Sequence, residues 1–492
     1  MLRKIRITLA AVMFIGIMWL FLDFTGTAHH WLAWMAKMQL LEALLAGSLI
    51  IVAVLSVATF IFGRIYCSVI CPLGIMQDLF GWLGKKAKKN RYTYSKEMKW
   101  LRYPVLALFI IAHVLGLAVL VQLLAPYAAF GRIATNLLQP VYQAGNNVLA
   151  AIAEHNDSYA FYHSDVWLRS GISLGIAAIT LVVLGILAWR NGRTYCNTIC
   201  PVGTLLSLLS RFSFLKITFD TEKCKSCSLC SKNCKAACID YKTHTVDASR
   251  CVVCGDCIES CKFGALKYTK RTSKASKTSE DSIDNSKRSF LLASALVTTA
   301  AMAQSKDKIM DGGLAEIEDK VAPERQTPLT PPGSLSAQNM ARNCTGCQLC
   351  ISECPNQVLR PSSDLMHLMQ PVMSYERGYC RPECNRCSEV CPAGAIKPIK
   401  HEVKASTQIG HAVWIKKNCI PLTDGVECGN CARHCPVGAI EMVPSDPDDE
   451  ESAYVPAINE SRCIGCGACE YLCPARPFSA IFVEGHEVHK EV

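Results

Sequence analysis

The sequence predicts a membrane α-helical bundle joined to small, cysteine-rich α+β domains. Of the 492 residues, 50% are hydrophobic and only 19% are charged, which favours a membrane protein. The 29 cysteines fall into groups with the spacing of metal ligands rather than of disulfides. The stretch GRIYCSVICPLG at residues 63–74 recurs as GRTYCNTICPVG at residues 192–203, which indicates two copies of one structural unit.

Residues 1–215 are expected to form the membrane domain, with four main spanning helices arranged as two repeated hairpins. The four apolar segments are residues 7–22, 40–63, 103–124 and 166–189. Basic residues precede the first segment and follow the second, so the positive-inside rule places both Cys-x-x-x-Cys-Pro motifs in the cytoplasm. A cleaved signal peptide is the alternative interpretation of the first segment.

The charge of the chain changes sign along its length. Residues 1–303 hold 33 Lys and Arg against 16 Asp and Glu, whereas residues 304–492 hold 18 against 25. The positive charge flanks the apolar segments, so we attribute it to membrane orientation and expect no nucleic-acid partner. In the inner, cytoplasmic membrane, the loops of residues 1–289 would face the cytoplasm and residues 304–492 the periplasm.

Residues 216–270 contain two four-cysteine runs with the spacing of a two-cluster ferredoxin. The runs are Cys224, Cys227, Cys230, Cys234 and Cys251, Cys254, Cys257, Cys261. Three thiolates of a run hold one [4Fe-4S] cubane, and the fourth ligates the other cluster. We therefore expect Cys261 to complete the first site and Cys234 to complete the second. Structural zinc is the alternative.

Three residues of this domain depart from the bacterial ferredoxin pattern. Lys235 and Lys262 follow the fourth cysteines, where bacterial ferredoxins usually have proline. Cys238 lies outside the runs and is either a spare buried thiol or a competitor of Cys234.

The next segments are expected to connect two domains. Residues 271–289 are polar and predict a flexible linker. Residues 290–303 are apolar and follow the pair Lys287-Arg288, so they resemble a twin-arginine export signal; a fifth membrane segment or a buried helix is the alternative. Residues 304–340 form a second linker.

Residues 341–492 contain four further runs, each followed by a proline, and predict four more cubanes. The runs are Cys344, Cys347, Cys350, Cys354; Cys380, Cys384, Cys387, Cys391; Cys419, Cys428, Cys431, Cys435; and Cys463, Cys466, Cys469, Cys473. The unequal spacing before Cys384 and Cys428 suggests that the middle runs pair with each other and the outer runs likewise. With the first ferredoxin, six clusters are expected.

The repeated motif offers four more thiols, Cys67, Cys71, Cys196 and Cys200. They lie at equivalent ends of the two predicted hairpins, so a pseudo-twofold axis along the membrane normal would bring them together. A seventh cluster shared between the repeats is one interpretation, and two redox-active or structural thiol pairs are the other.

A diffusible quinol would need a binding site near the membrane. Candidate polar groups are His29, His30, Tyr127 and Arg132, the last two within an expected outer loop at residues 125–165, although each also suits a purely structural role. His113 falls inside the third apolar segment, and without a second well-placed histidine we expect it to be packed or hydrogen-bonded rather than bound to haem.

The motifs together resemble a known family. Residues 1–270, with paired CxxxCP motifs and a two-cluster ferredoxin, resemble the NapH-type membrane ferredoxins of periplasmic nitrate reductase systems and the related NosR-like polyferredoxins. Residues 286–492 resemble the NapG type, an exported four-cluster ferredoxin, so the chain looks like a fusion of both. The resemblance implies a quinol dehydrogenase-type component that takes electrons from the quinol pool and passes them to a periplasmic reductase or electron carrier.

Two other functions fit the same motifs. The chain would act as a membrane redox sensor or a metal-site assembly protein if the clusters do not conduct, or as a soluble-type redox module with a membrane anchor. No Gly-rich dinucleotide motif supports the latter. The expected topology also leaves two clusters inside and four outside a hydrocarbon layer of about 30 Å, so either quinone or a further site must connect them, unless all clusters share one side.

Overall fold

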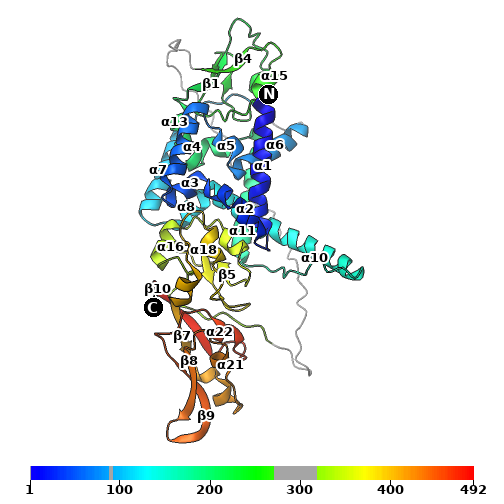
Figure 1. Ribbon diagram of the computed structural model, residues 1–492. Coiled ribbons are helices and arrows are strands. Elements are labelled where there is room, and N and C mark those ends of the chain that lie inside the picture. The colour runs from blue at the N-terminus through cyan, green and yellow to red at the C-terminus, as the bar shows by residue number, and fades with distance from the viewer. Residues whose placement is uncertain (1, 88–91, 271–317, 492) are drawn as a thin grey trace, which may run out of the picture.

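A helical domain lies between two cysteine-rich domains in the computed structural model (Figure 1). The structure describes residues 2–87, 92–270 and 318–491. The predicted linker at residues 271–289 and the predicted export signal or fifth membrane segment at residues 290–303 lie outside the described residues.

Helix α1 (Leu2–Leu22) connects the two ends of the molecule. Its 21 residues give a length of about 31 Å at 1.5 Å per residue, close to the thickness of a bilayer's hydrocarbon core. At its start, Arg3 Nε donates a 2.9 Å hydrogen bond to Asp256 of the first cysteine-rich domain. Near its end, α1 contacts helix α17 (Leu349–Ser352) of the last domain. The two cysteine-rich domains therefore lie at opposite ends of one apolar helix (Figure 1).

Two described helices, α1 and α11 (Gly171–Asn191), are long and apolar enough to cross a membrane. A third candidate is the bent pair formed by α8 (Ala118–Leu124) and residues 126–155, which meet at 76°. The predicted bundle of four spanning helices is thus not confirmed.

Two of the four predicted spans are broken helices in the structure. Residues 40–63 divide into α3 (Leu40–Leu45) and α4 (Leu49–Phe62), and residues 103–124 divide into α7 (Lys99–Val114) and α8. Gly47 and Gly116 stand at the breaks with φ values of 69° and 74°.

The hydrogen bonds at these breaks are those of Schellman motifs. The N–H of Ser48 donates to the carbonyl of Ala43 (2.9 Å), and the N–H of Leu117 donates to that of Ala112 (2.8 Å). Such bonds satisfy the last helical carbonyls while a glycine in the left-handed region turns the chain. The apolar runs continue through the breaks, so hydropathy alone suggests single helices.

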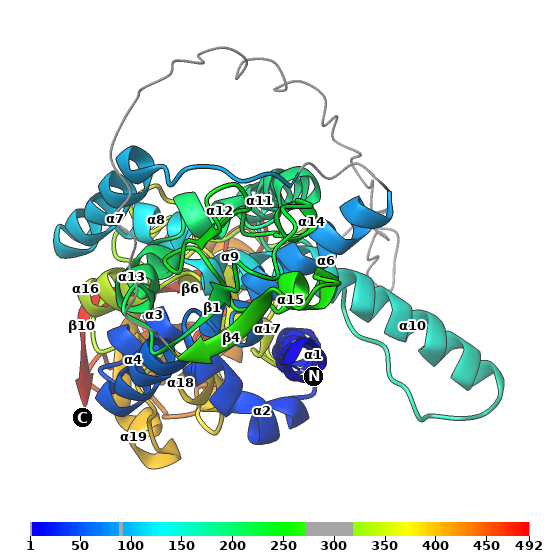
Figure 2. The ribbon, with the colours of Figure 1, turned by 90° about the horizontal axis from the view of Figure 1, so that it is seen from above.

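The expected outer loop at residues 125–165 is largely helical. It contains α9 (Pro126–Ile133), a π-helical turn η1 (Ala134–Leu138) and α10 (Gln139–His155). Helix α10 projects sideways from the helical domain when the molecule is viewed along α1 (Figure 2). Its side chains Val148, Leu149 and Ile152 are about half exposed, which suits a helix lying in a membrane interface.

The first cysteine-rich domain is built from two small antiparallel sheets. Strand β1 (Leu215–Phe219) pairs with β4 (Leu266–Lys270), and β2 (Ile239–Asp240) pairs with β3 (Thr245–Val246). The short helices α14 (Leu229–Lys232) and α15 (Asp256–Ser260) each follow the first cysteines of a run and contact each other.

The last domain has two similar units. The first contains α16 (Ala337–Asn343), α17, the hairpin β5 (Leu359–Pro361) and β6 (Pro371–Met373), α18 (Arg386–Val390) and α19 (His401–Ser406). The second contains η2 (Lys416–Asn418), α20 (Ile420–Thr423), α21 (Asn430–Arg433) and α22 (Ala468–Leu472), with two strand pairs. These pairs are β7 (Thr407–Trp414) with β10 (Ile481–Glu491), and β8 (Ile440–Asp446) with β9 (Asp449–Ile458).

Glutamine and asparagine side chains join the last domain to the helical domain. Asn136 Nδ2 donates to Gln348 Oε1 (2.6 Å), and Gln348 Nε2 donates to Ser173 Oγ (2.7 Å). Gln139 Nε2 donates to the Ser352 carbonyl (3.3 Å). Buried polar contacts of this kind fix orientation as well as proximity.

The two repeats adopt the same local structure. Each continues from a long helix, α4 or α11, through a short helix, α5 (Tyr66–Val69) or α12 (Thr194–Thr198), into α6 (Pro72–Lys86) or α13 (Pro201–Ser210). In both, the second cysteine is the N-cap residue and proline occupies the first turn, where its missing N–H is not needed. Helix α2 (Thr27–Lys37) completes the helical domain beside α1.

The last glycine of each repeat allows a close contact. A Cβ on Gly74 would overlap the Cys67 carbonyl and stand 3.2 Å from Arg193 Nη1, and a Cβ on Gly203 would overlap the Cys196 carbonyl and stand 2.8 Å from Arg64 Nη2. In each repeat, the glycine makes room for its own cysteine and for the arginine of the other repeat.

We therefore expect Gly74→Ala to destabilise the helical domain by about 1–3 kcal/mol, as overpacking does in other cores. The matched control is Gly175→Ala in α11, where a Cβ meets nothing within 4 Å and helix propensity improves by about 0.5–1 kcal/mol. Thermal unfolding of the detergent-solubilised protein, followed by circular dichroism, would show a lower midpoint temperature than the wild type for Gly74→Ala but not for Gly175→Ala. Equal midpoints for the two variants would contradict the packing argument.

Candidate iron–sulfur sites

The four cysteines of the repeated motif form one buried group, which we call the cap site. Its members are Cys67, Cys71, Cys196 and Cys200, each no more than 5% exposed. Burial raises the pKa of the Cys200 thiol, and the nearby thiols of the other three raise it further. Burial also raises the pKa of the Cys196 thiol to about 11. Such thiols stay protonated at neutral pH unless a metal centre stabilises the thiolates.

Two arginines cross between the repeats at this site. Arg64 Nη2, from the first repeat, donates to the Cys196 carbonyl (3.1 Å) and lies 3.7 Å from Cys67 Sγ. Arg193 Nη1, from the second repeat, donates to the Cys67 carbonyl. Both side chains are fully buried. Each repeat therefore holds the first cysteine of the other.

The unpaired donors of these arginines fit an anionic centre. Arg64 Nε and Arg193 Nη2 are buried without a hydrogen-bond partner, and Arg64 forms no ion pair within the part of the chain that the structure describes. A buried cation without a counter-charge is costly. A [4Fe-4S] cluster with four thiolate ligands would supply the negative charge, so the donor set of the cap site fits such a cluster.

A single metal ion fits less well. Over residues 2–87, 92–270 and 318–491, no group of three or more histidine, cysteine or carboxylate side chains is placed to hold one ion. Zinc would need four thiolates about 2.3 Å from one point, whereas a cubane stands between its ligands and keeps them further apart.

The first cysteine-rich domain brings together the two sets expected from the spacing. Site A, which lines one small cavity, consists of Cys224, Cys227, Cys230 and Cys261. Site B consists of Cys251, Cys254, Cys257 and Cys234, which lie close enough to influence one another's charge. The fourth cysteine of each run therefore completes the other site.

The residues that depart from the ferredoxin pattern contact site B and the helical domain. Cys238 Sγ lies 3.5 Å from Cys234 Sγ, and its hydrogen bond is the main reason why the pKa of Cys234 falls to about 7. Lys235 forms ion pairs with Asp78 of α6 (2.8 Å) and with Asp256 (3.3 Å). Lys235 thus links the first cysteine-rich domain to the helical domain through an ion pair, which a proline at this position could not form.

The last domain overturns the predicted pairing of its runs. Cys354 of the first run lines a cavity with three cysteines of the second run, so the middle runs do not pair with each other. The reason is local: α17 contacts α18, and α21 contacts α22, because each unit is a compact fold of two neighbouring runs. Spacing within a run carries no information on which run lies beside it.

Four sites result from this arrangement. Site C consists of Cys344, Cys347, Cys350 and Cys391; site D of Cys354, Cys380, Cys384 and Cys387; site E of Cys435, Cys463, Cys466 and Cys469; and site F of Cys419, Cys428, Cys431 and Cys473.

The sites on the α1 N-terminal side are adjacent to one another and to the cap site. Cys257 of site B lies within electrostatic reach of Cys230 of site A. Arg64 joins site B to the cap site, because its Nη1 donates to the Ser249 carbonyl (3.0 Å), two residues before Cys251, while its Nη2 approaches Cys67.

The row continues from the cap site into the last domain. The Arg132 guanidinium lies within electrostatic reach of both Tyr195, next to the cap site, and Cys347 of site C. Cys387 of site D is close enough to Cys350 of site C that its charge helps to raise the pKa of Cys350. The Cys380 N–H of site D donates to the Cys466 carbonyl of site E (2.9 Å). Cys469 of site E lies within electrostatic reach of Cys431 of site F. Seven tetracysteine sites therefore follow one another in the order A, B, cap, C, D, E, F.

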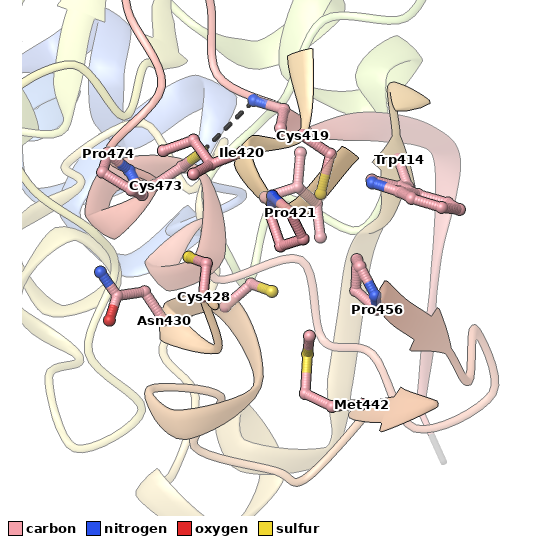
Figure 3. A pocket seen from close by; sticks show the side chains of 13 residues that line it. Trp414, Cys419, Ile420, Pro421, Cys428, Asn430, Met442, Pro456, Cys473 and Pro474 are labelled. Atoms are coloured by element: carbon pink, nitrogen blue, oxygen red, sulfur yellow. Dashed lines mark hydrogen bonds between the residues drawn. The ribbon is translucent and has the colours of Figure 1, made fainter. Parts of the chain in front are cut away.

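Site F ends the row, and its cysteines share a cavity with side chains of the β8–β9 hairpin (Figure 3). Trp414, Met442 and Pro456 line the same cavity as its cysteines, and the Ala480 N–H donates to Cys473 Sγ (3.3 Å). The tip of the hairpin carries exposed carboxylates, namely Asp446, Asp448, Asp449 and Glu451.

The four candidate quinol residues do not gather around one cavity. Tyr127 and Arg132 are fully buried near Cys347 of site C, and Arg132 also lies near Tyr195 beside the cap site. His29 is half-buried near Glu389, and His30 is exposed against the edge of Trp31. His113 is half-buried in α7.

Several residues of the sites were not identified from the sequence. Arg64 and Arg193 are identical in the two repeats, and that identity beside the cysteines is the signal that could have found them. Asp78 has no such signal, because its partners Arg6, Arg193 and Lys235 come from three separate segments.

Comparison with known domain families agrees with these sites. A model described as a 4Fe-4S binding domain matches the chain twice, over residues 44–91 and 171–219, and so covers both cysteine pairs of the cap site. A second 4Fe-4S binding domain matches residues 244–267, and a 4Fe-4S dicluster domain matches residues 426–476.

Curated relatives are ferredoxin-type proteins. The chain is 26% identical to the methylamine utilization ferredoxin-type protein MauN of Methylobacillus flagellatus over 42% of its own length and 64% of that protein, slightly less than two thirds. It is 29% identical to MauM of the same organism, over 33% of the chain and 70% of MauM. It is 28% identical to the ferredoxin-type protein NapF of Escherichia coli, over 32% of the chain and 87% of NapF.

The sites and the relatives lead to one conclusion. Cysteine groups with the composition of [4Fe-4S] sites recur along the chain, and the three relatives named above are ferredoxin-type proteins. The chain therefore carries several 4Fe-4S binding domains and is similar to ferredoxin-type proteins over part of its length.

Proposed function

We propose that the chain carries electrons from quinol across the inner membrane to a periplasmic reductase or electron carrier. The observation that gives this proposal the most support is that the tetracysteine sites form a continuous row from site A to site F. The row runs from one end of helix α1, which is as long as a bilayer is thick, to the other. [4Fe-4S] clusters, when bound, supply one-electron chemistry at potentials set by charge, hydrogen bonds and exposure. The role of the polypeptide is to hold these sites next to one another.

The cap site is the decisive member of the row. Sites A and B lie at the N-terminal end of α1, and sites C to F lie at the other end, so without a site between them the two groups would be separated by the helical domain. The four cap cysteines occupy this position among the helices. We infer that they bind a seventh cluster rather than two separate thiol pairs.

Buried cations around the cap site would favour electron acceptance. Arg64 and Arg193 stand fully buried beside the thiols, and positive charge in a medium of low dielectric stabilises the more negative, reduced form of a neighbouring centre. The two arginines are thus placed to hold the cap site at a potential accessible to quinol.

The orientation of the chain follows from its charges. Arg3, Lys4, Lys85 and Lys86 lie on the side of sites A and B, which we assign to the cytoplasm by the positive-inside rule. Site F and the acidic β8–β9 hairpin then face the periplasm, where a partner with a basic surface would dock. In this arrangement residues 1–270 take the NapH-type role and residues 286–492 the NapG-type role.

The seventh cluster can be tested by iron analysis. Cys67→Ala should remove about four of about 28 irons per chain, because a cubane holds four. Ser68→Ala is the matched control, since Ser68 is the buried neighbour of Cys67 and belongs to none of the seven sites. Iron and acid-labile sulfide would be measured on purified, anaerobically reconstituted protein. Unchanged iron in Cys67→Ala would falsify the cap cluster.

The docking surface can be tested by ionic strength. Replacing Asp448, Asp449 and Glu451 by Asn, Asn and Gln should slow electron transfer to a basic c-type cytochrome several-fold at low salt, because complementary charge speeds encounter. At high salt the variant and the wild type should be alike. The control is Glu222→Gln, an exposed carboxylate in the first cysteine-rich domain, which should leave the rate unchanged.

A stopped-flow measurement with chemically reduced protein would give these rates. If the hairpin variant and the wild type responded identically to salt, the acceptor would not dock on this surface. A redox sensor or assembly protein would instead show no reduction of its clusters by quinol in any variant.

A further inference from the structure

A cavity of about 860 Å³ lies between α1 and α6, at their junction with the first cysteine-rich domain. Ligand pockets for drug-sized molecules have volumes of about 300–1,000 Å³, so a quinone ring with part of its tail would fit. The cavity is at the opposite end of α1 from the histidines His29 and His30 of α2.

The lining divides into an apolar part and a polar end. Ile7, Ala11 and Ile15 of α1 face Leu79 and Trp82 of α6. Ile7, Ile15, Leu79 and Trp82 are each between 42% and 63% exposed, so this side of the cavity opens outward where α1 would meet lipid. An amphipathic ligand could enter from the membrane with its tail along these side chains.

The polar end is centred on Asp78. Its carboxylate accepts hydrogen bonds from Arg193 Nε (2.7 Å), Lys235 Nζ (2.8 Å) and Arg6 Nη1 (2.9 Å). Burial raises the pKa of Asp78, but the cations of Arg193 and Lys235 outweigh burial and hold that pKa far below its usual range. Arg6, which also lines the cavity, has its Nε buried without a hydrogen-bond partner.

Gln77 connects the cavity to the cap site. Its side chain lines the cavity, is only 1% exposed, and contacts Cys196 Sγ through Oε1 (3.5 Å), while Nε2 has no partner. If Cys196 is a thiolate, the amide turns over so that Nε2 donates to the sulfur, because the two amide atoms are interchangeable in position. In either orientation one polar atom of the Gln77 amide has no protein partner.

We propose that this cavity binds the quinol ring, with one ring oxygen at the Gln77 amide and the polar end of the ring near Arg6. The proposal rests on the proposed function, because it assigns the place where the electron donor binds. A bound ring would lie one side chain away from the cap site and beside Lys235, which follows Cys234 of site B.

Charge favours a quinol over an anionic phospholipid. The basic lining residues Arg3, Arg6, Lys85 and Lys235 are accompanied by the carboxylates Asp78, Asp256 and Glu259. Arg3 is already paired with Asp256 and Glu259, and Lys235 with Asp78 and Asp256. A phosphate would face these carboxylates, whereas a neutral ring would not be repelled.

The test is to fill the cavity from α1. Ala11→Trp should weaken binding of the quinol analogue heptylhydroxyquinoline N-oxide by about tenfold or more, the equivalent of about 1.4 kcal/mol, as followed by quenching of its fluorescence. Val12→Trp is the matched control, because Val12 is the neighbouring residue, is 54% exposed and does not line the cavity. Leu79→Trp fills the cavity from α6 and replaces Ala11→Trp if that variant does not fold, as judged by its iron content.

The outcomes separate the site from the function. If both cavity-filling variants bound the analogue as tightly as the wild type does, the proposed site would be overturned. If quinol still reduced the clusters of the wild type in that case, the proposed function would stand. Loss of bound phosphatidylglycerol from Ala11→Trp with unchanged analogue binding would assign the cavity to lipid and also overturn the site. Absence of both analogue binding and quinol reduction in the wild type would contradict the function itself.

Discussion

The crossed arginines of the cap site are the interaction on which the rest of the structure depends. Arg64 and Arg193 each leave their own repeat and hold the first cysteine of the other, within a fully buried core. A guanidinium in such a place is stable only when its hydrogen bonds and charge are matched. Arg193 meets this condition through Asp78, which also holds Lys235 and Arg6. The helices, the cap site and the first cysteine-rich domain are therefore parts of one polar network.

This network sets where the two cysteine-rich domains can lie. Lys235 and Arg64 attach the first domain beside the cap site, while Gln348 and its partners attach the last domain at the other end of the helices. Neither attachment is a flexible tether. The spacing of the sites is consequently a property of the fold, and the bilayer-length helix α1 is contacted at both ends by domains that hold cysteine sites.

Short-range features could be predicted from the sequence. The cysteine runs, the exchange of the fourth cysteine in sites A and B, and the similarity of the two repeats all depend on residues close together in the chain. The breaks at Gly47 and Gly116 were missed because the flanking residues are as apolar as those of an unbroken helix. The pairing of sites C to F and the role of Asp78 were missed because they depend on which segments meet in space, and a single sequence does not contain that information.

The crossed arginines also determine how much of the cap site a single repeat can supply. A single repeat carries two cysteines, one arginine and the glycine that makes room for the other repeat's arginine, but it lacks the arginine that holds its own first cysteine. Two separate copies related by a twofold axis would provide everything that the cap site contains. A homodimer of single-repeat chains would therefore be self-sufficient at this site, whereas in this chain one polypeptide supplies both repeats and both cysteine-rich domains follow the second repeat.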